Sequence, residues 1–142
     1  MKALLMSHSG LRYLVLLALV ALLIACIAGI LSKKPAGKAV RITGAAFVGL
    51  LDLQILLGLS VLAMGVWYPA LIGHIVMMVL AAGVAHVMLA KNRRLPVPGY
   101  KLPLIGALAA VVLVVGGIFA LPTCNPVAMG CGMIVRGVMS GG

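Results

Sequence analysis

Three histidines are the residues of this chain best suited to bind a cofactor. His8 stands near the N-terminus, and His74 and His86 lie within an apolar stretch at residues 70–90. Neutral imidazoles on facing helices can ligate haem iron from both sides of the macrocycle, which then lies between the helices of a bundle. The residue types therefore predict haem ligation. They leave open the alternative that each imidazole hydrogen-bonds a backbone carbonyl or a hydroxyl of a neighbouring helix.

The spacing of the histidines decides which of them can share a ligand. His74 and His86 are twelve residues apart, which is about 18 Å along a helix and about 120° around it. They cannot bind one metal together. His8 and His74 are expected in the same outer half of a membrane, so they form the best pair of axial ligands. Arg12, one helical turn after His8, is placed to pair with a haem propionate. His86 is left for a second, inner cofactor or for none.

Asp52 is the one acidic residue of the chain, and it stands in the middle of an apolar stretch at residues 42–65. An unpaired carboxylate in hydrocarbon is expected to be protonated, because loss of water disfavours its charged form. In that state it can relay a proton, hydrogen-bond a quinone carbonyl, or join one helix to another. We keep all three roles as hypotheses for Asp52.

The elements that position these side chains are predicted to be four membrane-spanning helices. The chain of 142 residues is 65% hydrophobic and 8% charged, whereas soluble domains are about 25% charged. Apolar stretches at about 11–31, 42–65, 70–90 and 102–121 each match the roughly 20 residues that a helix needs to cross a bilayer. We therefore expect an all-α, polytopic four-helix bundle over residues 1–121, followed by a C-terminal tail over residues 122–142.

The distribution of positive charge predicts the orientation of the bundle. The net charge is +10, but nucleic-acid binding is not expected, since the charges gather between spans and only six aromatic residues are available for stacking. The first and third connections carry most of the cations, namely Lys33, Lys34, Lys38, Arg41, Lys91, Arg93, Arg94 and Lys101, whereas Lys2, Arg12 and Arg136 lie on the other side. By the positive-inside rule both basic loops are cytoplasmic and both termini face outward, N-out and C-out.

Two cysteines in the tail suggest a disulfide. Cys124 and Cys131 are seven residues apart, and on the outer side of the membrane the compartment is oxidising, so a small disulfide-closed loop is expected. In the reduced state the two thiols, with Met129 and Met133, would make a soft site suited to Cu(I). We do not expect copper to be the cofactor.

Three segments resemble a known family. These are residues 8–13 (HSGLRY), 53–58 (LQILLG) and 73–78 (GHIVMM). They are similar to a family of small four-span bacterial membrane proteins that are often described as cytochrome b-like. The resemblance implies b-type haem with His8 and His74 as the ligand positions, and a bacterial membrane protein. We therefore expect the bacterial inner membrane, where the charge distribution puts both termini in the periplasm. One departure is that the family tends to have a histidine near the position of Asp52.

The leading functional hypothesis is a b-type cytochrome or a haem-associated electron-transfer subunit. The spans contain no catalytic triad, paired carboxylates, phosphate loop or zinc motif, so we expect an electron carrier or accessory subunit rather than a stand-alone enzyme. The second hypothesis is a haem-free accessory subunit of a larger respiratory or oxidase complex, and a weaker third is a copper or small-solute handling protein. The expected partners are membrane lipid and other membrane subunits.

Overall fold

The fold is an all-α bundle of four long helices. The computed structural model describes residues 2–33, 35–67 and 69–121. Its helices are α1 (Lys2–Leu31), α2 (Lys38–Ala63), α3 (Leu71–Arg94) and α4 (Lys101–Phe119). All four are long and apolar enough to cross a membrane, because even the shortest, with 19 residues, reaches about 28 Å at 1.5 Å per residue.

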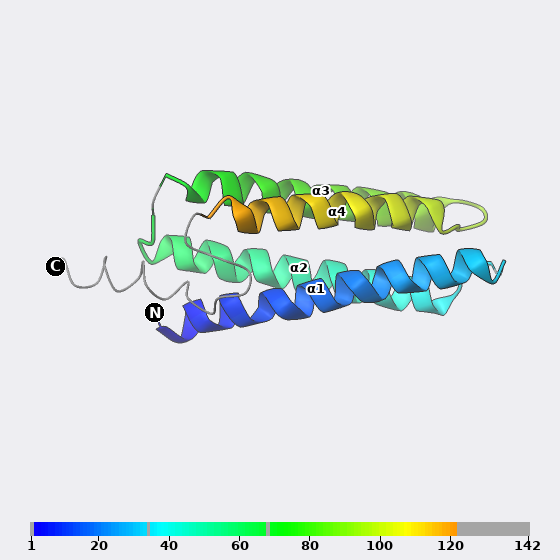
Figure 1. The fold of residues 1–142 in the computed structure, drawn as a ribbon, viewed down its shortest axis with the longest axis horizontal. Helices are drawn as coiled ribbons and strands as arrows, with labels where there is room; N and C mark the ends of the chain where they lie inside the picture. Colours follow the sequence, from blue (N-terminus) through cyan, green and yellow to red (C-terminus); the bar gives the residue numbers. More distant parts are fainter. Residues whose placement is uncertain (1, 34, 68, 122–142) are drawn as a thin grey trace.

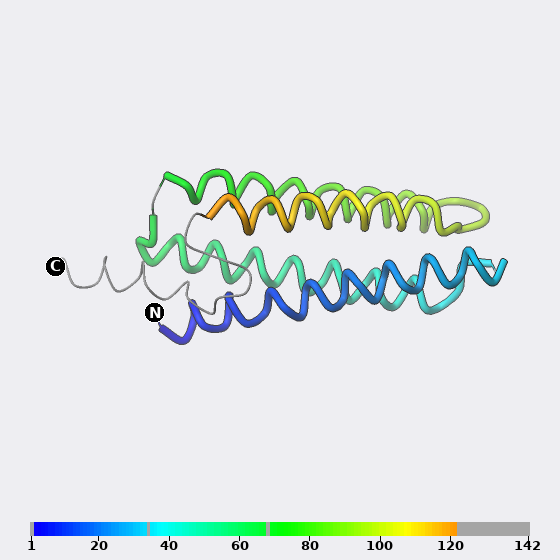
Figure 2. The backbone as a smooth tube through the Cα atoms, viewed as in Figure 1, coloured from blue at the N-terminus to red at the C-terminus, as the bar shows by residue number. Residues whose placement is uncertain are grey.

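The four helices form two antiparallel hairpins that pack as two layers. Figure 1 shows α1 beside α2 in one layer and α3 beside α4 in the other. The packing is closest within each hairpin. It is looser between α1 and α4 and looser still between α2 and α3. The backbone trace in Figure 2 shows that the start of α1 and the end of α4 lie at the same end of the bundle. The interface between the two hairpins is therefore the weakest part of the packing.

The helices extend beyond the apolar stretches of the sequence. α1 begins at Lys2, nine residues before the stretch that starts at residue 11, and α3 continues to Arg94, four residues past residue 90. A helix satisfies its backbone hydrogen bonds internally, so it continues into polar flanks until a residue stops it. At the end of α3 that residue is Pro96, because the residue before a proline avoids the helical conformation. Leu95 accordingly has an extended backbone, with ψ at 143°.

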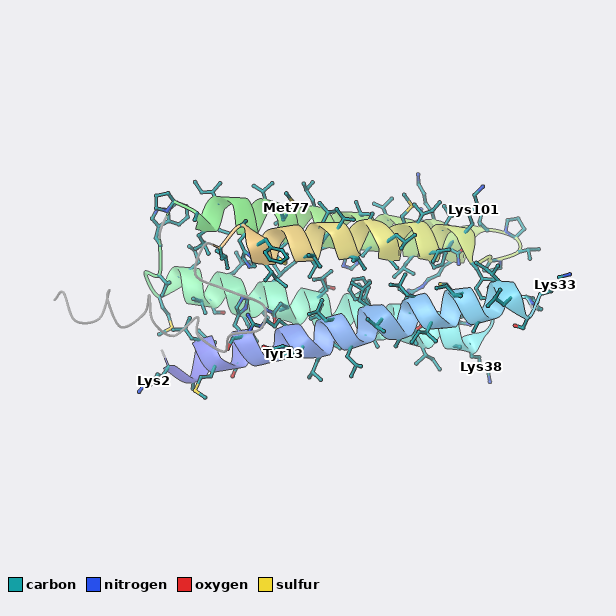
Figure 3. All side chains as sticks on the ribbon, viewed as in Figure 1. Lys2, Tyr13, Lys33, Lys38, Met77 and Lys101 are labelled. Carbon is teal, nitrogen blue, oxygen red and sulfur yellow. The ribbon has the colours of Figure 1, made fainter. Side chains whose placement is uncertain are left out.

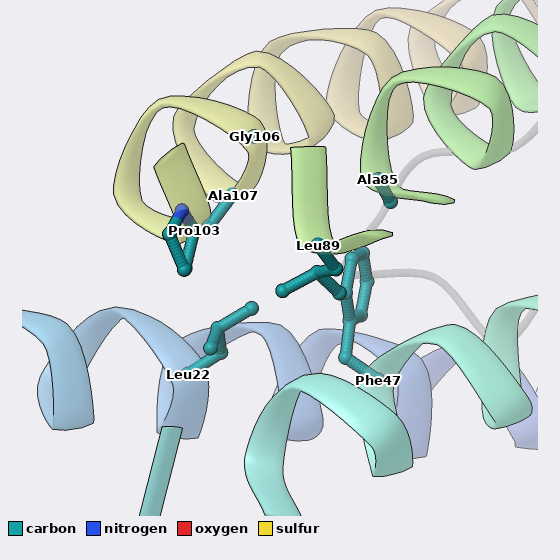
Figure 4. Close-up of a pocket in the computed structure, with 7 residues that line it drawn as sticks. All are labelled: Leu22, Phe47, Ala85, Leu89, Pro103, Gly106 and Ala107. Carbon is teal, nitrogen blue, oxygen red and sulfur yellow. The ribbon is translucent and has the colours of Figure 1, made fainter. Parts of the chain in front are cut away.

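The centre of the bundle is filled by side chains from all four helices. α1 and α2 contribute the larger ones, among them Leu22 and Phe47, whereas α3 and α4 contribute mainly small ones such as Ala85 and Ala107. Figure 4 shows these residues converging with Leu89, Pro103 and Gly106 on one point between the layers. The space that remains among them has no room for a water molecule. The core of this half of the bundle is therefore dry.

Most of the cations lie at one end of the bundle, which we call the basic end. Figure 3 shows Lys33, Lys38 and Lys101 there and Lys2 at the opposite end. Lys91, Arg93 and Arg94 in the last turn of α3 add to it. Tyr100 joins the two loops of this end. Its hydroxyl donates a hydrogen bond to the carbonyl of Pro35 over 2.9 Å, and its ring occupies the place that a Cβ at Gly29 would take.

Close packing of α3 against α4 depends on glycine. A Cβ at Gly106 would lie 2.8 Å from Cβ of Met88, and one at Gly117 would lie 3.1 Å from Cβ of Met77. Both neighbouring atoms are anchored directly to the backbone of α3, so they have little freedom to move aside. Such close approach stabilises helices in lipid, because burial of apolar side chains provides little driving force for their association there.

We expect Gly106→Ala to destabilise the bundle. The added methyl group forces α3 and α4 apart, and overpacking of this kind costs about 1–3 kcal/mol. The measurement is unfolding by sodium dodecyl sulfate in mixed micelles, followed by the helical circular dichroism signal.

Gly83→Ala is the matched control, because Gly83 is also in α3 and a Cβ there would meet nothing within 4 Å. It should change the unfolding free energy by less than about 0.5 kcal/mol. Equal stability of the two variants would show that α3 and α4 do not pack as closely as described.

Candidate functional site

A polar cluster lies inside the bundle at the end opposite the basic end. It contains His8, the seventh residue of α1, Gln54 of α2 and His74, the fourth residue of α3. The carbonyl of Gly117, two residues before the end of α4, completes it. Each helix supplies one member, so the cluster spans the interface between the two hairpins. The structure thus brings together the two histidines that the sequence predicts as a pair.

Gln54 holds His8 in place from the same hairpin. Its side chain is 7% exposed, and its Nε2 donates a hydrogen bond to the backbone carbonyl of His8 over 2.8 Å. The same Nε2 lies 3.4 Å from Nε2 of the His8 ring. That ring rests on Gly58, where a Cβ would come within 3.1 Å of Cε1 of His8. Glycine at position 58 therefore leaves the room that the imidazole occupies.

His74 is oriented by the other hairpin. Its Nδ1 lies 2.8 Å from the carbonyl oxygen of Gly117, and since a carbonyl only accepts, Nδ1 must carry the proton and donate it. In a neutral imidazole the second nitrogen, Nε2, then has a free lone pair. Histidines that bind metals usually have this arrangement, because the hydrogen bond fixes both the tautomer and the ring. His74 also satisfies the alternative expectation of a hydrogen bond to a backbone carbonyl.

The two imidazoles lie close together across the hairpin interface, with the edge of one toward the face of the other. Their ring centroids are 6.4 Å apart and their planes are inclined at 78°. Two buried polar atoms of the cluster, Nδ1 of His8 and Oε1 of Gln54, have no hydrogen-bond partner. Leaving such an atom unsatisfied costs about 1–3 kcal/mol. The cluster therefore retains unused capacity to bind a polar or metal-containing group.

Arg12 makes its described contacts with its neighbour rather than with the histidines. Its Nη2 donates a hydrogen bond to the hydroxyl of Tyr13 over 2.8 Å, and the guanidinium carbon lies 4.8 Å from the centroid of the Tyr13 ring. Tyr13 is 46% exposed and faces away from the core. Arg12 remains one helical turn from His8, at the same end of the bundle.

Asp52 and His86 form a second, separate polar pair. Nε2 of His86 lies 2.9 Å from Oδ1 and 3.1 Å from Oδ2 of Asp52, which joins α2 to α3. Their side chains are 51% and 52% exposed, so the pair lies on the outside of the bundle. Twelve residues of α3 separate it from His74, or about 18 Å along the helix. His86 and His74 thus belong to different sites.

Several members of these sites were not expected from the sequence. Gln54, Gly58 and the carbonyl of Gly117 belong to the first cluster. In the second site, the contact between Asp52 and His86 was not predicted. Asp52 and His86 are each 17 residues from Pro69, in the turn between α2 and α3. Counted from the helix ends, however, Asp52 is 11 residues before the end of α2 and His86 is 15 residues after the start of α3, so the count of residues from the turn does not identify the pair.

The donor set limits which metals the described residues can hold. Among residues 2–33, 35–67 and 69–121, no group of three or more His, Cys, Asp or Glu side chains comes together as a metal site. Cys26, the cysteine of the described residues, is buried and free. The expected disulfide between Cys124 and Cys131, and the alternative copper site with Met129 and Met133, lie outside the described residues.

Comparisons of the chain with protein-family models, with curated proteins and with solved structures give no match. Its function therefore has to be inferred from the geometry of its two polar sites.

We expect Asp52 and His86 to be energetically coupled. In a double-mutant cycle with Asp52→Asn and His86→Gln, the two losses of stability should fall short of additivity by about 0.5–3 kcal/mol, as for residues in direct contact. The measurement is again unfolding in mixed micelles.

The control cycle combines Asp52→Asn with His74→Gln, whose side chains belong to different sites. These two changes should be additive within about 0.5 kcal/mol. Additivity in the first cycle as well would contradict the contact between α2 and α3.

Proposed function

We propose that the protein is an integral membrane, b-type cytochrome-like electron-transfer subunit, with His8 and His74 as the axial ligands of one haem. The observation that carries the proposal is the placement of the two imidazoles, 6.4 Å apart by ring centroid, on opposite hairpins. Two imidazoles that bind one metal from opposite sides, each at a metal–nitrogen distance of about 2 Å, have centroids about 6 Å apart.

The chemistry of the donor set favours haem over a bare metal ion. An ion held by protein alone needs three or four ligands, and the described residues assemble no such group. Haem needs only two, because the macrocycle supplies four nitrogens. When bound, it supplies one-electron redox chemistry. His74 is held with one ring nitrogen free, and His8 has a ring nitrogen that is buried and unpaired.

The hairpin interface is where a planar group fits with the least disturbance. A macrocycle between His8 and His74 has to separate the α1–α2 layer from the α3–α4 layer at that end. The helices contact each other less between the layers than within them, so separation of the layers sacrifices less packing than separation of the two helices of a hairpin.

Arg12 is the residue we assign to a haem propionate. Its guanidinium has five N–H donors, and the bond to Tyr13 leaves the others available. A carboxylate at the end of the bundle gains a charge-assisted hydrogen bond from such a group. Arg12 is the one cation of the described residues within a helical turn of the cluster.

We further propose that the protein lies in a bacterial inner membrane with the basic end in the cytoplasm and both termini in the periplasm. Seven cations of the described residues lie at the basic end and two, Lys2 and Arg12, at the other, which is the asymmetry that the positive-inside rule uses. An electron carrier also needs a donor and an acceptor, so we infer that the protein works with other membrane subunits.

We expect protein purified in mild detergent to carry near-stoichiometric haem with the reduced-minus-oxidised spectrum of a b-type cytochrome. His8→Ala and His74→Ala should each remove most of it, because each takes away one axial ligand. The measurements are the visible spectrum and pyridine haemochrome quantification.

His86→Gln is the matched control and should retain the haem, since His86 belongs to the other site. Colourless wild-type protein that remains folded would overturn the haem assignment. If that protein also co-purified with other membrane subunits, it would establish a haem-free accessory subunit instead.

We expect alkaline phosphatase fused after Gly142 to be active and green fluorescent protein fused at the same position to be dark. Each reporter works on only one side of the inner membrane, so the pair reads the location of the C-terminus directly. The opposite result, a fluorescent fusion with inactive phosphatase, would reverse the proposed orientation.

A further inference from the structure

The Asp52–His86 pair lies deep in the membrane, although it is on the outside of the bundle. His86 is eight residues before Arg94, the end of α3, which places it about 12 Å from the basic end. Asp52 is eleven residues before Ala63, the end of α2, or about 16 Å from the other end. With about half of each side chain exposed, the pair faces the hydrocarbon of the bilayer.

Polar side chains in the hydrocarbon of a membrane cost free energy, so a pair in this position is expected to have a function. Ionisable side chains inside a membrane nearly always face the interior of a bundle or a water-filled cavity, and they mark functional sites. The described hydrogen bonds use only Nε2 of His86, so its Nδ1 is available to a ligand, and the carboxylate of Asp52 retains lone pairs. The pair thus offers both a nitrogen and carboxylate oxygens to one ligand.

A groove runs along α3 from the pair toward the basic end. It is lined by Val48, His86, Leu89, Ala90 and Arg93 and has a volume of about 70 Å³, enough for several water molecules. His86, Leu89, Ala90 and Arg93 follow one another at helical spacing on one face of α3. The groove therefore has apolar walls, the histidine at its deep end and a cation at its aqueous end.

We propose that Asp52, His86 and this groove form a binding site, open sideways to the lipid, for the ring of a quinol or quinone. The pair lies about 12 Å from the basic end, and its exposed side and the apolar walls of the groove favour a ligand that dissolves in hydrocarbon over water-soluble ligands and phospholipid head groups. Quinols and quinones dissolve in hydrocarbon. A quinol hydroxyl can donate a hydrogen bond to the carboxylate of Asp52, and a quinone carbonyl can accept one from an N–H of His86. The ring packs against Val48 and Leu89, and the groove gives the exchangeable protons of the quinol a path to water beside Arg93.

The chemistry of the site favours a polar ring over a covering helix. Asp52 and His86 hydrogen-bond each other, and the remaining acceptor sites of the carboxylate and the second ring nitrogen of His86 lie beside a narrow groove. A helix satisfies its own backbone groups and would offer only side chains here. The proposal does not depend on haem at the cluster of His8 and His74, since the two sites are separate.

The test is photolabelling of the full-length protein in lipid nanodiscs with an azido-benzoquinone, with mass spectrometry to locate the label. Labelling should concentrate on α2 and α3 beside Asp52 and His86, and it should be suppressed by an excess of decyl-benzoquinone. Asp52→Asn and His86→Gln should each weaken the apparent affinity about tenfold, as expected for loss of a hydrogen bond to a charged group.

Leu53→Ala is the matched control, because Leu53 is the neighbour of Asp52 and faces the lipid. It should change the affinity less than about twofold, within the range of an ordinary surface substitution. Labelling that does not saturate, or that spreads over all lipid-facing surfaces, would overturn the proposal. A cross-linker attached at Ala90, which lines the groove, gives a further check. If it joined a second protein chain and labelling was then lost, the proposal would be overturned and the groove would be a subunit interface.

The outcome is independent of the haem result. Specific labelling of colourless protein would support the quinone site while refuting the cytochrome. A haem-loaded protein without specific labelling would support the cytochrome and refute the quinone site. Because wild-type protein alone gives the position and saturation of the label, a variant that fails to fold does not remove the test.

Discussion

The lack of water inside a membrane is the constraint on which the rest of this structure depends. Backbone groups are satisfied within each helix, and hydroxyl side chains such as those of Thr43 and Ser60 hydrogen-bond carbonyls of their own helix. Each larger polar side chain of the two sites has its partner on another helix. Gln54 finds it on α1, His74 on α4, and Asp52 on α3. In a bundle whose other contacts are apolar and non-directional, these few hydrogen bonds determine how the helices are rotated and aligned relative to one another.

The two polar sites differ in what they face, and this difference separates their chemistry. The cluster of His8 and His74 takes one member from each of the four helices, and both imidazoles are half-buried, so a group bound there would be held from both hairpins. The pair of Asp52 and His86 belongs to α2 and α3 alone, the neighbouring helices that pack least closely, and it is reached from the bilayer. A site held from both hairpins suits a resident cofactor, and one open to the bilayer suits a molecule that comes and goes.

The four helices could be predicted from the sequence, because an apolar stretch of about 20 residues has few other stable structures in a membrane. The proximity of His8 and His74 was also predicted, from their shared depth. The contacts of Gln54 and the partnership of Asp52 with His86 were not. Helices that are apolar on every side carry no periodicity to show which face points inward, so their rotation had to come from the structure.

The basic end has a consequence for the behaviour of the protein in an energised cell. Seven described cations lie at one end of the bundle and two at the other, a difference of five charges. A transmembrane voltage acts on each charge with about 2.3 kcal/mol per 100 mV. If the side that carries the seven cations is electrically negative, inversion of the bundle costs about 12 kcal/mol at 100 mV. A membrane potential of that sign would thus stabilise the orientation in which the basic end lies on the negative side.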